Sequence, residues 1–338
     1  MDIKLYFLCG GLSTNDIISF INKNVYSSFS NLFTSSKKIE KEKYSTLENI
    51  GIYELMLEYT NNNVKDILNK LNDTIYTSLN YSTIETSFVL LNNKNTKIFP
   101  LPYMSNDTNI KNINEFTEYK SKFGSYDKNN NITNCKDYWK NIKINSSFNY
   151  LHNSSLSIDW KFTKNITNSV PLRTYNIKKF KKNMEDIINN NTKDIYLFFC
   201  DHELIIDMLK NIKPFNKNIN KLTIEKGSLW EINAKIDNKK LIYSSYNKIY
   251  PSEHNYDPLT KLNNDYQYSY KNYNFNILNN KMNIPLDMLK NIIKTTRIDY
   301  KKKNKIKDII KNNKNNKNNK NNKNNNINKN FTFNEIFK

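Results

Sequence analysis

LYFLCGGLSTND, from Leu5 to Asp16, is the stretch of sequence that decides the fold. The apolar residues Ile3 to Leu8 are typical of a buried parallel strand, and the glycines Gly10 and Gly11 predict that this strand ends in a tight turn. Apolar residues at helical spacing follow from residue 17 to residue 21. A strand, a glycine turn and a helix in this order predict an α/β fold.

The same alternation of strands and helices continues along the chain. Further strands are predicted at residues 74–77, 97–101 and 195–199, and a hairpin-like pair at 223–236 and 241–244. Helical spacing occurs at residues 47–59, 64–71, 84–91, 176–190 and 202–209. This order predicts a three-layer αβα sandwich with a mainly parallel sheet. Ligands of such sheets bind beyond the carboxyl ends of the strands, so the candidate site residues follow Leu8, Thr77 and Phe199.

Composition divides the chain into three parts. The predicted elements lie in residues 1–245, with a polar, aperiodic insertion at about residues 105–170. Residues 246–300 form an Asn- and Tyr-rich extension, and residues 301–338 a low-complexity Asn/Lys tail that we expect to be disordered. The tail holds 11 lysines and one aspartate between residues 301 and 330, so it supplies +10 of the net charge of +20. We interpret it as a solvated tail, with nucleic-acid binding as the alternative.

The three cysteines, Cys9, Cys135 and Cys200, indicate a reducing compartment. They cannot form a paired disulfide framework, and their spacing fits no zinc motif. The apolar start of the chain is too short for a membrane span and lacks the features of a signal peptide. We therefore expect an intracellular, cytoplasmic protein, with a nuclear location as the alternative, and no membrane, metal or cofactor.

Cys9 and Cys200 end two of the predicted strands. Two buried structural thiols are the expected outcome at these positions. A thiol, redox or metal site that includes His202 is the alternative.

Six segments resemble, in order, segments of the histidine phosphatase superfamily, the phosphoglycerate mutase-like proteins. LYFLCGGLSTND is similar to the family's first strand, which ends in Arg-His-Gly followed by Glu-Ser or Glu-Thr. LENIGIYEL at 47–55 resembles the family's Leu-Thr-x-x-Gly helix, and IYTSLNYSTIETS at 75–87 its Ser-x-x-x-Arg-x-x-x-Thr-Ala signature. The other three segments are LPYMSN at 101–106, FFCDHELIIDML at 198–209 and GSLWE at 227–231.

The resemblance implies phosphoryl transfer onto the family's first His, with two Arg residues and a second His around the phosphate. The position of that nucleophile holds Gly10, which has no side chain to attack phosphorus. The two Arg positions hold Cys9 and Ser82, and the position of the family's acidic proton donor holds Asn106. Only His202 is retained, and we expect it to be structural rather than catalytic.

The remaining residues of the expected crevice make it acidic, because Asp201 and Glu203 flank His202 and would repel a phosphate. Gly11, Ser13 and Ser78 are expected to line it. Arg173, one of only two arginines, follows the insertion and is the candidate replacement for the lost clamps.

These observations favour a non-catalytic pseudophosphatase that acts by binding, with an unidentified protein as the expected partner and no phosphate ligand. The alternative is an active phosphatase or phosphoglycerate mutase-family enzyme that uses substitute residues such as Arg173, His202 and Glu203. A third hypothesis is a nucleic-acid-associated protein that binds through its Lys-rich tail.

Overall fold

The structure is a computed structural model that describes most of the first 250 residues. The described residues are 1–16, 18–19, 40–59, 61–71, 74–92, 95–105, 110, 112–127, 132–135, 138–141, 151, 156–163, 175–210, 212 and 224–250. Asn106, Arg173, most of the predicted extension and the whole Lys-rich tail lie outside these residues, so the predictions made for them stay predictions.

A nine-stranded sheet forms the centre of the molecule, in the order β4-β5-β6-β3-β2-β7-β1-β8-β9. The five strands from β6 to β1 are parallel, whereas the pairs at both flanks are antiparallel. The prediction of a mainly parallel sheet is therefore confirmed for the centre of the sheet. In sheet order the bounds are Ser125–Asp127, Ile132–Asn134, Ser157–Asp159, Lys97–Leu101, Ile75–Ser78, Ile195–Cys200, Asp2–Cys9, Leu229–Asp237 and Lys240–Tyr250.

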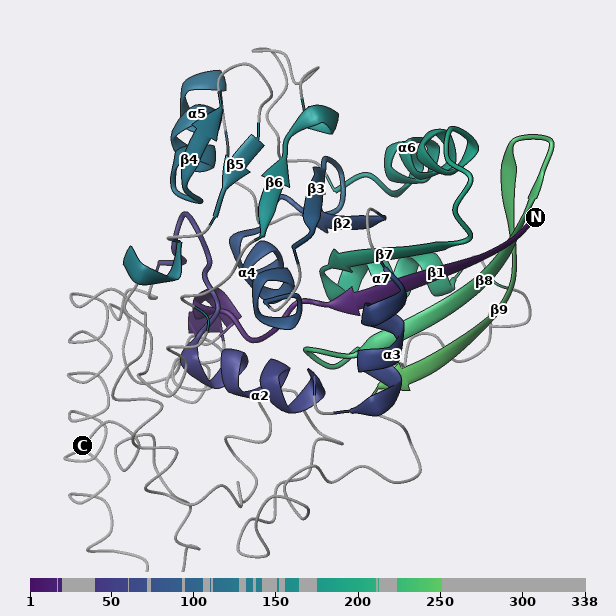
Figure 1. Ribbon diagram of the computed structural model, residues 1–338, viewed down its shortest axis with the longest axis horizontal. Helices are drawn as coiled ribbons and strands as arrows, with labels where there is room; N and C mark the ends of the chain where they lie inside the picture. The colour runs from purple at the N-terminus through teal and green to yellow at the C-terminus, as the bar shows by residue number, and fades with distance from the viewer. Residues whose placement is uncertain are drawn as a thin grey trace, which may run out of the picture.

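Helices cover both faces of this sheet, which confirms the three-layer prediction (Figure 1). One face packs against α2 (Asn49–Tyr59), α3 (Asn62–Lys70) and α4 (Tyr81–Leu90), and the other against α6 (Ile177–Asn189) and α7 (His202–Leu209). None of the described helices is long and apolar enough to span a membrane.

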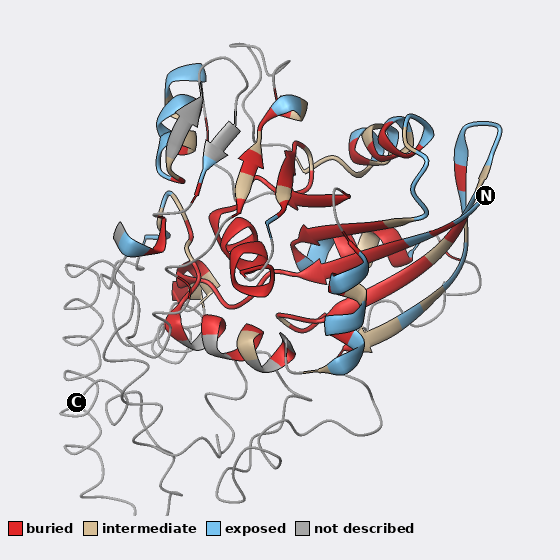
Figure 2. Ribbon diagram, viewed as in Figure 1, coloured by how far each residue is buried: buried red, intermediate tan, exposed pale blue. Residues whose placement is uncertain are grey.

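The first strand shows why the sequence folds in this way. Ile3, Leu5 and Phe7 are buried on the side of α6 and α7, while Leu8 is buried on the other side. Burial on both faces explains the continuous apolar run, because a central parallel strand has no solvent face. Figure 2 shows the same central strands in the colour of buried residues.

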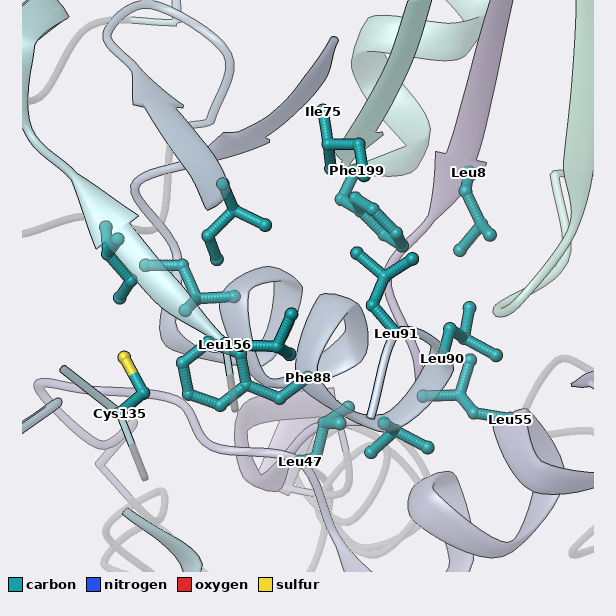
Figure 3. Close-up of a cluster of buried hydrophobic side chains, with 14 of the residues drawn as sticks. Leu8, Leu47, Leu55, Ile75, Phe88, Leu90, Leu91, Cys135, Leu156 and Phe199 are labelled. Carbon is teal, nitrogen blue, oxygen red and sulfur yellow. The ribbon is translucent and has the colours of Figure 1, made fainter. Parts of the chain in front are cut away.

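The core on the α2–α4 side joins side chains that are far apart in the sequence. Leu8 of β1 and Phe199 of β7 point toward Leu55 of α2 and toward Leu90 and Leu91 at the end of α4 (Figure 3). The carboxyl end of the sheet therefore rests on α2 and α4, and both helices hold the turn that follows β1.

The insertion predicted at residues 105–170 contains ordered elements that its sequence pattern does not predict. It forms α5 (Ile113–Ser121), the strands β4 to β6, and the short helices η1 (Trp139–Asn141) and η3 (Lys161–Thr163). Its aromatic side chains pack against α4, for example Tyr138 on Phe88 with ring centroids 5.2 Å apart. Short elements held by aromatic clusters leave no regular apolar period in the sequence, which explains why these helices and strands were not predicted.

The C-terminal hairpin also differs from its prediction. β8 begins at Leu229 rather than at residue 223, because Gly227 has a φ of +75° and the chain turns there. β9 extends to Tyr250, five residues past the predicted domain boundary at 245. β9 is an edge strand with one side exposed to solvent. Its many polar residues obscure the alternation of apolar and polar residues that would predict the full strand.

Candidate functional site

The three segments expected to line a crevice do meet at the carboxyl end of the sheet. Cys9 of β1 is the register partner of Cys200 of β7, and Thr77 of β2 is the partner of Phe199. Beyond the strands, the backbone N–H of Gly10 donates to the carbonyl of Cys200 at 2.8 Å. Parallel strands that end together bring these segments together.

The space beside Gly10 is filled by Thr83 from the first turn of α4. A β-carbon on Gly10 would lie 2.9 Å from Cγ2 of Thr83, closer than such contacts occur. Thr83 is fully buried, and its hydroxyl donates to the carbonyl of Asn80 at 2.8 Å and lies 2.6 Å from the hydroxyl of Ser78. No side chain can therefore enter at residue 10 unless Thr83 moves.

The residues around this contact have structural partners. The N–H of Gly11 donates to the hydroxyl of Thr86 at 3.0 Å, and that hydroxyl donates to the carbonyl of Ser82 at 2.6 Å. Ser82 is buried in the first turn of α4, where its N–H donates to the side chain of Asn80, the residue that caps the helix. Ser82 and Thr86 thus tie α4 to the glycine turn.

The glycine in the second resembling segment is explained by close packing. A β-carbon on Gly51 of α2 would lie 2.4 Å from the carbonyl oxygen of Leu12. The N–H of Glu48 donates to that same carbonyl at 2.9 Å. α2 therefore lies directly against the turn after β1, where only glycine fits.

Cys9 and Cys200 are free, and both are fully buried. Burial raises the pKa of both thiols, so they stay protonated and are poor nucleophiles. Within the described residues no group of three or more His, Cys, Asp or Glu side chains could hold a metal ion. The geometry thus agrees with two buried structural thiols.

His202 is the first residue of α7, and its side chain is 47% exposed. Its Nδ1 lies 3.3 Å from Oε2 of Glu203, which is equally exposed. Asp201 is buried at the N-cap position of the helix, where its Oδ1 accepts a hydrogen bond from the amide of Asn80 at 3.4 Å. The acidic neighbours predicted for His202 are therefore present at the site.

Sequence reasoning missed Lys226, a cation beside the predicted crevice. The N–H of Gly227 donates to the carbonyl of Cys9 at 3.0 Å, which places the turn of Lys226 at the end of β1. The sequence pattern predicts site residues only after strands that end at this edge. β8 is antiparallel to β1, so its start lies at this edge too.

Asp16 holds the ammonium group of Lys226. Nζ of Lys226 lies 2.9 Å from Oδ2 of Asp16, and the two side chains are 20% and 25% exposed. The same Oδ2 accepts hydrogen bonds from the N–H of Ser13 at 2.9 Å and from its hydroxyl at 2.7 Å. Ser13 is thereby occupied in ordering Asp16 rather than available to a ligand.

This pair also decides the protonation of both groups. Burial opposes the charge of Asp16, but Lys226 and the hydrogen bonds from Ser13 hold the pKa of the carboxyl below its ordinary value. Burial would lower the pKa of Lys226, but the carboxylates of Asp16 and Asp201 raise it above the ordinary value. Lys226 is therefore charged and unable to act as a base, and Asp16 neutralises it.

The known proteins that this chain is similar to are found among solved structures. No family model matches the chain, and no curated protein matches it. Among solved structures, it is similar to a mutant phosphoserine phosphatase from Entamoeba histolytica in complex with phosphoserine, with 11% identity and a TM-score of 0.35 over 72% of this chain and 96% of that one. It is also similar to an alpha-ribazole phosphatase from Shigella flexneri, with 12% identity and a TM-score of 0.33 over 71% and 94%.

A third similar structure is the YhfR protein of Bacillus stearothermophilus, with 11% identity and a TM-score of 0.32 over 71% of this chain and 95% of that one.

Proposed function

We propose that this chain is a histidine phosphatase-like protein that has lost phosphoryl transfer and that acts by binding another protein. One observation supports the first part of this proposal: Cγ2 of Thr83 lies 2.9 Å from the position that the β-carbon of any side chain at residue 10 would occupy. Thr83 is held there by hydrogen bonds to the β2–α4 turn. The packing around residue 10 therefore fits the glycine that stands at the position of the family's nucleophilic His.

The electrostatics of the site support the same proposal. Phosphoryl transfer requires positive charge where negative charge develops on the phosphate. Cys9 and Ser82, at the two expected Arg positions, are buried and uncharged. The charge of Lys226 is neutralised by Asp16, and Asp201 and Glu203 add negative charge beside His202. A phosphate dianion would meet no net positive charge at these residues.

An active enzyme with substitute residues is the competing hypothesis. The exposure of His202 favours it, since an exposed imidazole can reach a substrate. However, the neighbouring thiols are buried with raised pKa values, and Lys226 stays protonated. Among the described residues at this site, His202 would have to act as nucleophile beside a lysine, Lys226, that is already paired with Asp16.

A direct assay separates these two hypotheses. The purified full chain is incubated with p-nitrophenyl phosphate and with 3-phosphoglycerate, beside a His202→Ala variant and a Lys210→Ala variant as a surface control. We expect no turnover that depends on His202. Turnover that is lost in His202→Ala but retained in Lys210→Ala would overturn the proposal.

The partner and the location belong to the same proposal. We infer a protein partner because the fold is kept and well packed while the groups needed for phosphate chemistry are replaced. An intracellular location is supported by three cysteines that are free and buried, as suits a reducing compartment. Cross-linking in intact cells, followed by purification of the tagged chain, would identify a partner.

A further inference from the structure

Helix α6 carries an unusual distribution of charge. Its sequence IKKFKKNMEDIIN places four lysines among the first six residues, and the first turn holds no acidic residue. The amino end of a helix carries a partial positive charge, so cations there are unfavourable for helix stability. These lysines are not placed where they would stabilise the helix.

The packing of α6 directs three of these lysines to solvent. Phe180, Met184, Ile187 and Ile188 are buried against the sheet and fix the rotation of the helix. Lys178, Lys179 and Lys182 are exposed, and we call these three residues the lysine face. In Figure 2 the outer side of α6 has the colour of exposed residues.

No residue of the lysine face forms an ion pair within the described part of the chain. Lys179 lies over the ring of Tyr103 at 5.1 Å, a contact that leaves its charge unneutralised. On the neighbouring helix, by contrast, Nζ of Lys210 lies 2.7 Å from Oδ1 of Asp207. The lysine face is therefore an exposed cluster of three lysines that form no ion pair with the described residues.

We propose that the lysine face binds the phosphate backbone of a nucleic acid without reading its sequence. Lysines clustered along one helix are the electrostatic footprint of backbone binding, in which each contacted phosphate releases counterions. The net charge of +20 of the whole chain would attract such a partner over a longer range. This inference is independent of the function proposed for the degenerate site.

The composition of the lysine face argues against the other polyanionic partners. The core of a protein interface is apolar and depleted of lysine. The exposed large hydrophobic residues in the described part of the chain are Met1, Ile113 and Ile242, none of which lies on α6. An amphipathic helix inserts into a membrane surface through its apolar face, and this face of α6 is already buried against the sheet.

The test compares two triple variants of the full chain. The first replaces Lys178, Lys179 and Lys182 by Gln. The control replaces Lys65, Lys70 and Lys235, which are also exposed, by Gln, so both variants lose the same charge. Binding to a mixed-sequence DNA duplex of about 30 base pairs is measured by fluorescence anisotropy between about 50 and 200 mM salt. Circular dichroism confirms that both variants are folded.

We expect the lysine-face variant to bind at least about tenfold more weakly, and the slope of log affinity against log salt to shrink by about 2 to 3, since each phosphate contact contributes about 0.9. The control should change much less. Equal losses in both variants would overturn the proposal, because binding would then follow overall charge or the C-terminal tail. Binding to poly-glutamate is measured in the same way. If the chain does not bind DNA, the proposal is overturned, whether or not the chain binds poly-glutamate.

Discussion

Cγ2 of Thr83 lies 2.9 Å from the position that a β-carbon on Gly10 would occupy. One residue belongs to the turn after β1 and the other to the first turn of α4, so the contact exists only in the folded chain. Residue 10 therefore has a structural role, because the turn after β1 packs against α4 through the contact between Gly10 and Thr83.

The first prediction concerns this contact. Gly10→Ala should lower the free energy of unfolding by about 1–3 kcal/mol, because the added methyl group overpacks a buried site. Thr83→Ser keeps the hydroxyl and removes Cγ2, so the double variant should lose less stability than the two single changes together. Urea unfolding of the four proteins measures this coupling. Additive losses would show that Thr83 does not exclude a side chain at residue 10.

The second prediction concerns the pair of Asp16 and Lys226. Asp16→Asn should lower the free energy of unfolding by about 1–3 kcal/mol at neutral pH, because it weakens charged hydrogen bonds and leaves a partly buried ammonium group without its partner. The pKa of Asp16 is lowered in the folded state. Its stabilisation is therefore complete above the unfolded pKa of about 3.9, and is lost as the pH falls through the folded value.

The difference between wild type and Asp16→Asn should accordingly shrink below about pH 4. Urea unfolding at a series of pH values measures it, with Asp66→Asn on the exposed side of α3 as the control. A difference that stays constant into strongly acidic solution would contradict the ion pair.

The third prediction concerns Glu58 of α2, which is buried with no hydrogen-bond partner for either carboxyl oxygen among the described residues. Burial, and then the nearby Glu54, raise its pKa well above the ordinary value. The folded state therefore loses stability as the pH rises from the unfolded pKa of about 4.3 toward the folded pKa. Glu58→Gln, which stays neutral, should gain stability over wild type through that range.

The gain corresponds to about 1.4 kcal/mol for each unit of pKa shift. Thermal or urea unfolding between about pH 4 and pH 8 measures it. Glu40→Gln, at an exposed position, is the matched control and should show little change. If Glu58→Gln were no more stable than wild type at neutral pH, the carboxyl would not be buried as described.

The fourth prediction concerns the cysteines. Cys9, Cys135 and Cys200 are all buried and form no disulfide, and burial raises the pKa of each thiol. A thiol reagent such as Ellman's reagent should find almost no reactive thiol in the native protein and three in concentrated guanidinium chloride. Rapid reaction of one thiol in the native state would revive a thiol-based site at Cys9 or Cys200.

Most of the fold could be predicted from local patterns. β3 and α7 have the bounds that apolar spacing predicted, at residues 97–101 and 202–209. The insertion could not be predicted in this way. Its elements are short, and they are ordered by aromatic contacts with α4, such as Tyr138 on Phe88, rather than by their own periodicity.

The candidate site, too, could be predicted from the sequence only in part. The replacements at Gly10, Cys9 and Ser82 are visible in the sequence, because each lies within a segment that resembles a family segment. Lys226 was missed because no strand ends before it, and its place at the site depends on β8 running antiparallel to β1. Strand direction follows from pairing between distant segments, which a local pattern does not contain.

By itself the sequence determined the order of strands and helices outside the insertion, the meeting of three segments at one sheet edge, and the absence of a side chain at Gly10. These follow from apolar periodicity, from glycine and from the rule for parallel strands, all of which act locally or through chain order. Only the tertiary structure decided that Thr83 fills the space beside Gly10 and that Asp16 neutralises Lys226. Both contacts join distant segments, and their geometry depends on how helices and turns pack against the finished sheet.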